Sequence, residues 1–209
     1  MTAAQLVALG ASLFDRRLTH GRTGNLSFRD GERIVVTPTG ASLGDLHADA
    51  LSVIDTEGRH VSGPPPTKEA FLHAAVYRAR PEAGAVVHLH STYAVAVSCL
   101  ADVDPSDVLP PLTAYYRMRV GKLPLLPFRA PGDASLGPIA EQAARDHHAL
   151  LLANHGSLVA GPDLLTAADA AEELEETARI HLLLQGHRTT SAPANEPEER
   201  PGDHPCHDG

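Results

Sequence analysis

Apolar positions recur along the chain with two different periods, and the period predicts where helices and strands lie. Helical spacing of leucine, alanine and valine predicts helices over 3–18, 67–80, 93–100, 136–146 and 166–185. Short β-branched or apolar runs predict strands over 26–29, 33–37, 51–55, 85–92, 112–120, 123–128 and 149–153. No internal repeat interrupts this pattern.

Capping signals locate the ends of two of these helices. Three prolines make 62–66 a rigid approach, and Thr67 then stands where a helix N-cap belongs, which places Lys68 and Glu69 in the opening turn. Thr166 with Asp169 predicts a loose capping box for the last helix. Four glutamates, at 172, 173, 175 and 176, are expected to form the solvated face of that helix.

The pattern ends near Arg188, and this boundary divides the chain in two. Residues 1–187 are expected to form one catalytic domain. Residues 188–209 are polar and rich in proline and glutamate, so we expect a disordered C-terminal tail. Histidines at 187, 204 and 207, with Cys206, could bind metal adventitiously, and we predict no function for them.

Composition limits the classes of protein that fit. The chain has 209 residues, 43% of them hydrophobic, which suits one well-buried domain. Only two cysteines, Cys99 and Cys206, and no basic stretch ahead of an apolar one suggest a cytoplasmic protein. No apolar run is long enough for a membrane span. A formal net charge of -9 argues against a nucleic-acid partner.

Two histidines in one predicted strand are the strongest candidate chemistry. His88 and His90 alternate in the strand 85–92, so they share a face about 7 Å apart along the chain. Imidazole suits zinc and its first-row neighbours, and a catalytic zinc usually has three protein ligands. His155, beside Gly156 at the end of another strand, is the candidate third ligand. Alone it fits an ordinary polar strand end better; with His88 and His90 it fits a ligand better.

Several glycine- and hydroxyl-containing turns admit two interpretations. The turn 21–27 and the turn at Pro38-Thr39-Gly40 could cradle an anion, or they could simply connect strands. Thr67 and Lys68 at a helix N-terminus would make an anion site. Glu69 in the same turn also fits ordinary compensation of the helix dipole.

A tyrosine and two arginines share one alternating face of the predicted strand 112–120. Tyr115, Arg117 and Arg119 could face solvent or an anion, and periodicity does not decide between them.

Taken together, these residues resemble the class II aldolase/adducin family over about Ala3 to Arg188. The resemblance rests on motifs in the family's order and spacing, namely Gly24-Asn25-Leu26-Ser27, Thr37-Pro38-Thr39-Gly40, Glu69, His88-Leu89-His90 and Asn154-His155-Gly156. Further motifs look most like the subgroup of decarboxylases that act on 3-oxo-tetronate 4-phosphates. They are Thr67-Lys68-Glu69, Ser98-Cys99-Leu100, Arg117-Met118-Arg119-Val120-Gly121, Pro131-Gly132-Asp133 and the glutamate-rich run 172–178.

The resemblance implies the fold and the assembly. The expected fold is α/β, a three-layer α/β/α sandwich with a largely antiparallel central sheet. The expected assembly is a four-fold symmetric homotetramer with active sites between subunits.

The resemblance also implies the roles of individual residues. His88, His90 and His155 would hold a divalent metal, usually zinc, and Glu69 would be the acid/base residue and a ligand in the absence of substrate. Tyr115, or its neighbour Tyr116, would take part in proton transfer. A phosphate would be cradled by Gly24, Asn25, Thr39, Gly40 and Thr67, and Lys68 could pair with the phosphate or with the departing carboxylate.

The implied activity is a zinc-dependent carbon–carbon lyase. A decarboxylase would convert 3-oxo-tetronate 4-phosphate, a phosphorylated sugar acid, to dihydroxyacetone phosphate and CO2 through a metal-stabilised enediolate. A fuculose-phosphate aldolase-like enzyme, which releases an aldehyde from a ketose phosphate, is the alternative. A non-enzymatic scaffold of the adducin kind fits less well, because the histidine set and Glu69 are intact.

Overall fold

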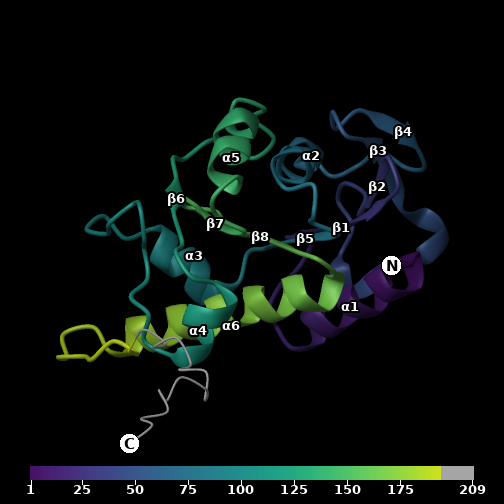
Figure 1. Ribbon diagram of the computed structural model, residues 1–209. Coiled ribbons are helices and arrows are strands. Elements are labelled where there is room, and N and C mark those ends of the chain that lie inside the picture. The colour runs from purple at the N-terminus through teal and green to yellow at the C-terminus, as the bar shows by residue number, and fades with distance from the viewer. Residues whose placement is uncertain (194–209) are drawn as a thin grey trace, which may run out of the picture.

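The computed structural model describes residues 1–193 and places a single mixed sheet between two layers of helices (Figure 1). The strands are β1 (Asn25–Asp30), β2 (Arg33–Val36), β3 (Ser52–Asp55), β4 (His60–Ser62), β5 (Ala85–Leu89), β6 (Leu125–Leu126), β7 (Ala149–Leu152) and β8 (Gly156–Gly161). Their order in the sheet is β4-β3-β2-β1-β5-β8-β7-β6. All neighbouring pairs are antiparallel except β6 and β7.

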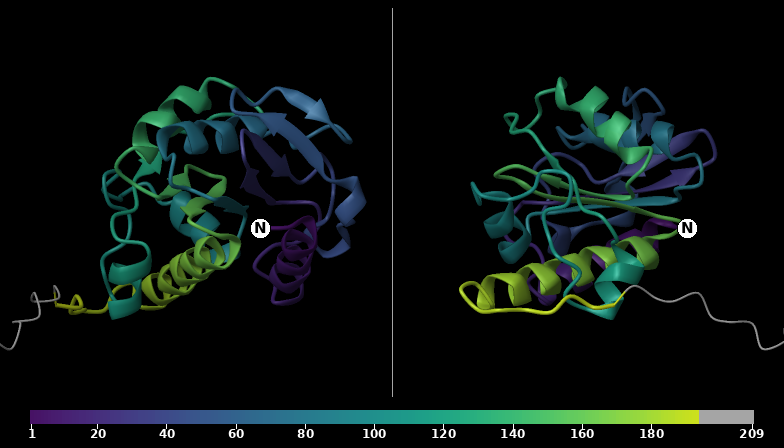
Figure 2. Two further views of the ribbon diagram at one scale, coloured as in Figure 1. Left: turned by 45° about the vertical axis from the view of Figure 1, so that its right-hand side comes forward. Right: turned by 60° about the vertical axis from the view of Figure 1, so that its left-hand side comes forward.

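Helices cover both faces of this sheet. They are α1 (Ala3–Asp15), α2 (Ala70–Ala79), α3 (Thr92–Ser98), α4 (Ala114–Arg119), α5 (Leu136–Ala144) and α6 (Leu164–Leu183), with short 3-10 turns at Leu43–Asp45 and Ala48–Ala50. Helices α2 and α5 pack together on one face, and α1, α3, α4 and α6 lie on the other (Figures 1 and 2). The expected three-layer sandwich with a largely antiparallel sheet is confirmed.

Each layer has its own apolar core, and β5 contributes to both. Its odd-numbered residues, among them Val87 and Leu89, pack in the core shared with α1, α3 and α6. Val86 packs in the core shared with α2 and α5. Because successive side chains on a strand point to opposite faces, His88 lies on the α2 side of the sheet.

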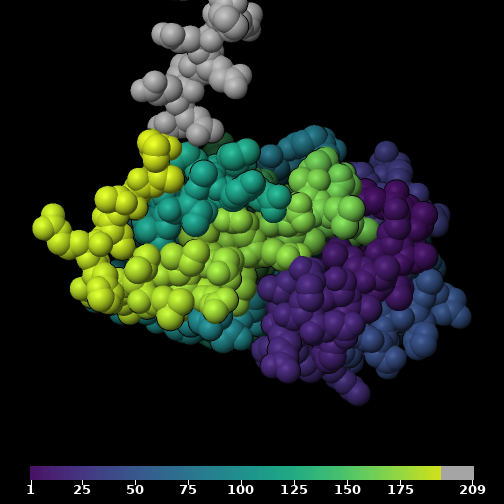
Figure 3. Space-filling view, turned by 90° about the horizontal axis from the view of Figure 1, so that it is seen from below, coloured from purple at the N-terminus to yellow at the C-terminus, as the bar shows by residue number. Residues whose placement is uncertain are grey.

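Helix α6 contacts the other helices on its face of the sheet through its acidic side chains. Figure 3 shows α6 and α1 side by side on the outer surface, where Glu172 pairs with Arg16. Glu173 accepts a hydrogen bond from Thr113, and Glu175 accepts the backbone N–H groups of Tyr93 and Ala94. The prediction of a merely solvated glutamate face was therefore wrong, and only Glu176 of the four is exposed.

The segment 112–120 was predicted as a strand and is instead helical. Residues with strand propensity, including two tyrosines, suggested the wrong period. The buried positions are Tyr116 in α4 and Val120 at its C-cap, four residues apart, and Thr113 caps the helix by accepting the N–H of Tyr116. In a strand Met118 would share the buried face, but it is 66% exposed, so burial follows the helical period and outweighs the local propensity.

Strand β8 was missed by the sequence analysis, and two predicted caps are shifted. The run Ser157-Leu158-Val159-Ala160 returns antiparallel to β7. Helix α2 begins at Ala70 with Glu69 in the N-cap position, so Thr67 and Lys68 precede the helix rather than open it. Helix α6 is capped by Asp163, which accepts the N–H of Thr166.

Two further points concern the membrane and the tail. No helix in residues 1–193 is long and apolar enough to cross a bilayer. Of the predicted tail, His204, Cys206 and His207 lie outside the described residues. His187 is exposed.

Candidate metal centre

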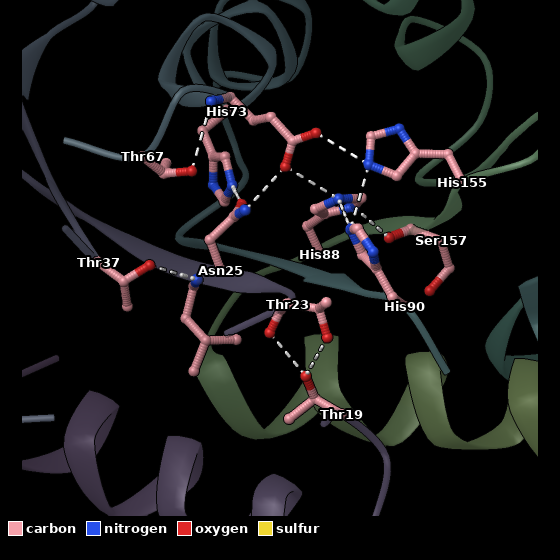
Figure 4. Close-up of polar contacts among 12 residues, drawn as sticks. Thr19, Thr23, Asn25, Thr37, Thr67, His73, His88, His90, His155 and Ser157 are labelled. Carbon is pink, nitrogen blue, oxygen red and sulfur yellow. Dashed lines mark hydrogen bonds and ion pairs between the residues drawn. The ribbon is translucent and has the colours of Figure 1, made fainter. Parts of the chain in front are cut away.

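Four of the predicted site residues converge on one point. The ligand atoms of Glu69, His88, His90 and His155 all lie within 4.8 Å of one another. The Nε2 atom of His90 is 3.0 Å from Nε2 of His88 and 3.1 Å from Nε2 of His155. The two carboxylate oxygens of Glu69 lie 3.1 Å from His88 Nε2 and 2.9 Å from His155 Nε2. Figure 4 shows the three imidazoles facing one another around this point.

The histidines reach the point from two neighbouring strands. His88 is on β5, and His90 directly follows that strand. His155 lies in the turn of the β7–β8 hairpin, where Asn154 has a positive φ of 56°. Gly156 allows the hairpin to lie against β5, because a Cβ atom there would be 2.2 Å from the carbonyl oxygen of Leu89. The sequence Asn154-His155-Gly156 thus combines a tight turn with a close backbone approach.

Glu69 enters the cluster from the helical layer of α2 and α5. It occupies the N-cap position of α2, and its own side chain makes no capping hydrogen bond. Instead the carboxylate extends to His88 and His155 and accepts a hydrogen bond from the side-chain amide of Asn25. Compensation of the helix dipole is therefore not what fixes this side chain.

The donor set fits a divalent cation. His88 donates Nδ1–H to the carbonyl oxygen of Ser157, which leaves its Nε2 lone pair pointing to the other ligands. Oε1 of Glu69 is buried and accepts no hydrogen bond, although His155 Nε2 is only 2.9 Å away. Three imidazole nitrogens and a carboxylate whose ligand atoms all converge on one point are a familiar ligand set for zinc and its neighbours.

The protonation of these groups follows from their burial and mutual contact. Burial alone raises the pKa of Glu69, but the charge of His88 and the polar contacts of His155, His88 and Asn25 hold it well below its usual range. Burial, with the charges of His88 and His155, lowers the pKa of His90 to about 3. Burial lowers the pKa of His88, but its contact with Glu69 outweighs burial and raises it, so a cation that binds Nε2 of His88 must displace a proton, whereas His90 is already neutral.

The predicted anion-binding turns come together next to this cluster. The N–H of Thr37 bonds to the carbonyl of Leu26, and the N–H of Thr67 bonds to the carbonyl of Thr37. The N–H of Thr39 bonds to the carbonyl of Pro65. Three segments distant in sequence, those of Gly24, Thr39 and Thr67, are thereby held at one end of the sheet.

The individual positions differ in how open they are. Thr39, Gly40 and Lys68 are exposed, and Thr67 is buried at 9% exposure. Gly24 has a φ of 77°, and a Cβ atom there would be 2.9 Å from the carbonyl oxygen of His88, so the turn lies tightly against β5. Asn25 is buried, and its amide already bonds to Glu69 and His73.

Tyr115 is not brought to the cluster within the chain. It lies on α4 with 60% of its surface exposed, and its ring contacts the guanidinium of Arg119. Tyr116 is fully buried with its hydroxyl unpartnered, and burial raises its pKa. Their roles in proton transfer stay predictions.

A cavity of about 450 Å³ opens beside His90 and His155. It is lined by His20, His90, Thr92, Val95, Phe128, Arg129, Pro131, Asn154 and His155. The sequence analysis assigned no site role to His20, Phe128 or Arg129, since each comes from a turn whose place relative to the sheet is set only by the fold. It also missed His73, although its position four residues after Glu69 places it one helical turn away.

Comparison with known proteins agrees with this architecture. The family model described as Class II Aldolase and Adducin N-terminal domain matches residues 4–182. A 3-oxo-tetronate 4-phosphate decarboxylase from Haemophilus influenzae is 50% identical over 184 residues, which are 88% of each chain. The crystal structure of YgbL from Klebsiella pneumoniae superposes with a TM-score of 0.87 at 44% identity, covering 90% of this chain and 94% of that one. An L-fuculose phosphate aldolase from Methanocaldococcus jannaschii is 32% identical, over 88% of this chain and 97% of its own.

The largely antiparallel α/β/α sandwich is the fold of the class II aldolases, and its cluster of three histidines and a glutamate fits a divalent metal. The chain belongs to the class II aldolase and adducin family.

Proposed function

We propose that this protein is a metal-dependent decarboxylase that converts a 3-oxo-tetronate 4-phosphate to dihydroxyacetone phosphate and CO2. The proposal depends on one observation, the convergence of Glu69, His88, His90 and His155 beside the linked turns of the sheet. The choice of substrate is supported by relatives of that name, which are 50% and 41% identical in Haemophilus influenzae and Cupriavidus necator.

The four converging side chains would hold one divalent cation, for which we propose zinc. Bound there, the cation supplies Lewis-acid stabilisation of negative charge on the substrate oxygens. The chain itself fixes its ligands: the carbonyl of Ser157 sets the His88 tautomer, and Asn25 holds Glu69. Both contacts pre-organise the ligands before substrate arrives.

In the proposed reaction the substrate is a β-keto acid. The bond between C1 and C2 breaks, the carboxyl group departs as CO2, and the electron pair remains as an enediolate across C2 and C3. A proton added to C2 then completes dihydroxyacetone phosphate. Glu69 is the buried acid/base group beside the cluster, and Tyr115 is the second proton donor that we propose.

The phosphate would bind at the turns of Gly24, Thr39 and Gly40, with Asn25 and Thr67 behind them. Lys68, exposed next to this point, would pair with the phosphate or with the departing carboxylate. The turn at Pro131-Gly132-Asp133 borders Lys68, since a Cβ atom on Gly132 would be 3.5 Å from the Lys68 Cβ. Anchoring the remote phosphate orients the reacting carbons over the metal centre.

A CO2-release assay on the 3-oxo-tetronate 4-phosphate isomers tests the proposal. Purified protein is expected to release CO2 from one isomer, and a chelator is expected to stop the reaction. Release of an aldehyde from a ketose phosphate, with no CO2 from the keto acid, would replace the decarboxylase by the aldolase alternative. That alternative is supported by aldolase relatives of lower identity, such as the 32% identical L-fuculose phosphate aldolase.

We further propose a homotetramer with sites at the subunit interfaces. Tyr115 and Met118 are 60% and 66% exposed and lie three residues apart on α4, and neighbouring exposed apolar side chains can mark an interaction surface. An interface over α4 would cover them and could bring Tyr115 to the metal centre of a neighbouring subunit.

A non-enzymatic scaffold is disfavoured because the ligand set is intact. We also propose that residues 1–187 form the catalytic domain and that the protein is located in the cytoplasm.

A further inference from the structure

A line of buried polar side chains runs from Glu69 into the layer between the sheet and α2. Asn25 donates its amide N–H to Glu69, at 2.9 Å, and its carbonyl oxygen contacts Nε2 of His73 (Figure 4). Nδ1 of His73 is 2.7 Å from the hydroxyl of Ser27, which is 2.9 Å from the hydroxyl of Tyr77. All five residues are at most 7% exposed.

The chemistry of the groups fixes the direction of each hydrogen bond. A carbonyl oxygen only accepts, so Nε2 of His73 carries the hydrogen and donates to Asn25. The neutral ring then accepts at Nδ1 from the Ser27 hydroxyl, and Ser27 accepts in turn from Tyr77. Burial and the charge of His88 lower the pKa of His73 to about 3, which agrees with the neutral form.

The opposite orientation of the Asn25 amide is excluded by its two neighbours. If the amide were flipped, its carbonyl oxygen would lie about 2.9 Å from an ionised carboxylate oxygen, acceptor against acceptor. His73 would then have to accept a hydrogen from the amide nitrogen, and Ser27 would have to accept one from Nδ1. Only the orientation described gives every group between Tyr77 and Glu69 a partner of the right kind.

We propose that His73 is a positioning residue that holds the amide of Asn25 so that its N–H is directed at Glu69 and keeps the carboxylate turned toward the metal centre. His73 does not touch the metal ligands, and it acts only through Asn25. An apolar side chain on this face of α2 would fill the same space, yet it would leave the Asn25 carbonyl without a donor. The catalytic consequence depends on the proposed decarboxylase function, whereas the effect on metal affinity does not.

Two near-isosteric variants separate positioning from packing. In His73→Gln the amide nitrogen lies near the former Nε2 position and can still donate to Asn25. In His73→Asn the shorter side chain occupies the Nδ1 side and does not reach Asn25. We expect His73→Asn to lower kcat and Co²⁺ affinity by about 10- to 100-fold, as is typical when a partner of a metal ligand is lost, with KM little changed.

The glutamine variant is the matched control. His73→Gln is expected to retain kcat and Co²⁺ affinity to within about threefold, with Co²⁺ absorption titrations as the binding measurement. If kcat and Co²⁺ affinity fall equally in both variants, or fall in neither, the positioning role is overturned. Thermal unfolding is compared alongside, since equal melting temperatures show that packing alone does not explain a difference.

A measurement on the unaltered protein covers the case in which a variant does not fold. Long-range ¹H–¹⁵N NMR on the metal-free protein is expected to show His73 neutral with the hydrogen on Nε2, whereas a hydrogen on Nδ1 would overturn the proposal. If wild-type protein releases no CO2 from any keto acid isomer, the proposed function fails. The NMR and Co²⁺ results then still decide the role of His73.

Discussion

Glu69 is the residue on which the proposed chemistry depends most, and its surroundings explain why. Its carboxylate is 7% exposed and faces two imidazoles and one amide N–H. A buried carboxylate with one oxygen lacking a hydrogen bond is costly unless a cation lies nearby. In the proposed mechanism this oxygen would be a metal ligand in the absence of substrate, and the same carboxylate would transfer a proton to or from bound substrate.

Replacing this carboxylate by its amide tests the acid/base role. Glu69→Gln keeps the size of the side chain, so we expect the fold to remain and kcat for CO2 release to fall by about 10²- to 10⁴-fold. The measurement is steady-state CO2 release together with the melting temperature. Glu57→Gln, at an exposed turn, is the control and should keep full activity. A Glu69→Gln variant with near-normal kcat would remove Glu69 from the mechanism.

The second prediction concerns how the buried His73 makes the stability of the protein depend on pH. Its pKa is about 3 in the folded protein, against an ordinary value of 6.5, because burial and the His88 charge disfavour the imidazolium. Between these values the unfolded chain binds a proton that the folded protein does not. Stability is therefore lost as pH falls below about 6.5, and this residue has no further effect above it.

The size of the loss follows from the shift. We expect His73 to lower the free energy of unfolding by about 2–3 kcal/mol between pH 6.5 and pH 4.5. Urea unfolding of the metal-free protein at several pH values measures it. The His73→Gln variant cannot titrate there and should show a shallower dependence, and equal slopes in both proteins would contradict the prediction.

The residues that could be predicted from sequence were those whose spacing carries chemistry. His88 and His90 alternate on one strand, and His155 stands beside a glycine at a strand end. His73 follows Glu69 by one helical turn, but nothing in the sequence indicates that it meets Asn25 and Ser27 of β1. The convergence of the ligands could thus be predicted from the sequence, whereas the side chains that position those ligands could not.

At the level of elements, α6 acts through glutamates that reach other helices. Glu175 accepts the N–H groups of Tyr93 and Ala94 and so satisfies the open N-terminus of α3. Helix α3 in turn supports the His155 hairpin, because Ser98 accepts the N–H of Asn154. A helix on the outer surface is in this way connected to the metal centre.

Removing the Glu175 carboxylate should therefore destabilise the protein. Glu175→Ala leaves two backbone donors without a partner, and we expect the free energy of unfolding to fall by about 1–3 kcal/mol. Its exposed neighbour provides the control, since Glu176→Ala should change stability by no more than about 0.5 kcal/mol. Urea denaturation compares the two, and equal losses would show that α3 does not depend on this contact.

Helices and strands could be predicted where the spacing of apolar residues matched the burial pattern. They could not be predicted where the element is short or buried on all sides. The helices α1, α5 and α6 show a clear apolar stripe, and their predicted ranges overlap the observed ones. In α4 six residues are too few for the helical period to outweigh two tyrosines with strand propensity. Strand β8 is buried at every position, so no alternation of apolar and polar residues marks it as a strand.

At the level of the whole molecule, the metal centre joins the two helical layers through the sheet. Glu69 comes from the layer of α2, and His155 from a hairpin held by α3. A cation that binds only the folded arrangement must stabilise the entire domain. The sandwich itself followed from the family resemblance, whereas this link between the layers became visible only in three dimensions.

Metal removal should accordingly lower the melting temperature. At a free metal concentration about 1,000 times the Kd, binding adds roughly 4 kcal/mol, which corresponds to a shift on the order of ten degrees. Calorimetry before and after dialysis against a chelator measures the shift, and re-added Zn²⁺ should restore both stability and CO2 release. His90→Ala should show little response to metal, and a similar shift in that variant would point to binding elsewhere.

The exposed position of Tyr115 allows the shared-site proposal to be tested with two inactive proteins. His90→Ala removes a ligand, and Tyr115→Phe removes the proposed proton donor. If Tyr115 serves the metal centre of a neighbouring subunit, hybrids of the two variants contain some sites with both residues intact. Random mixing in a closed ring should then recover about a quarter of the wild-type activity. If Tyr115 acts within its own subunit, every site in the hybrids is defective. Recovery of activity on mixing therefore distinguishes the two arrangements. An absence of recovery would show that Tyr115 does not serve a neighbour's site.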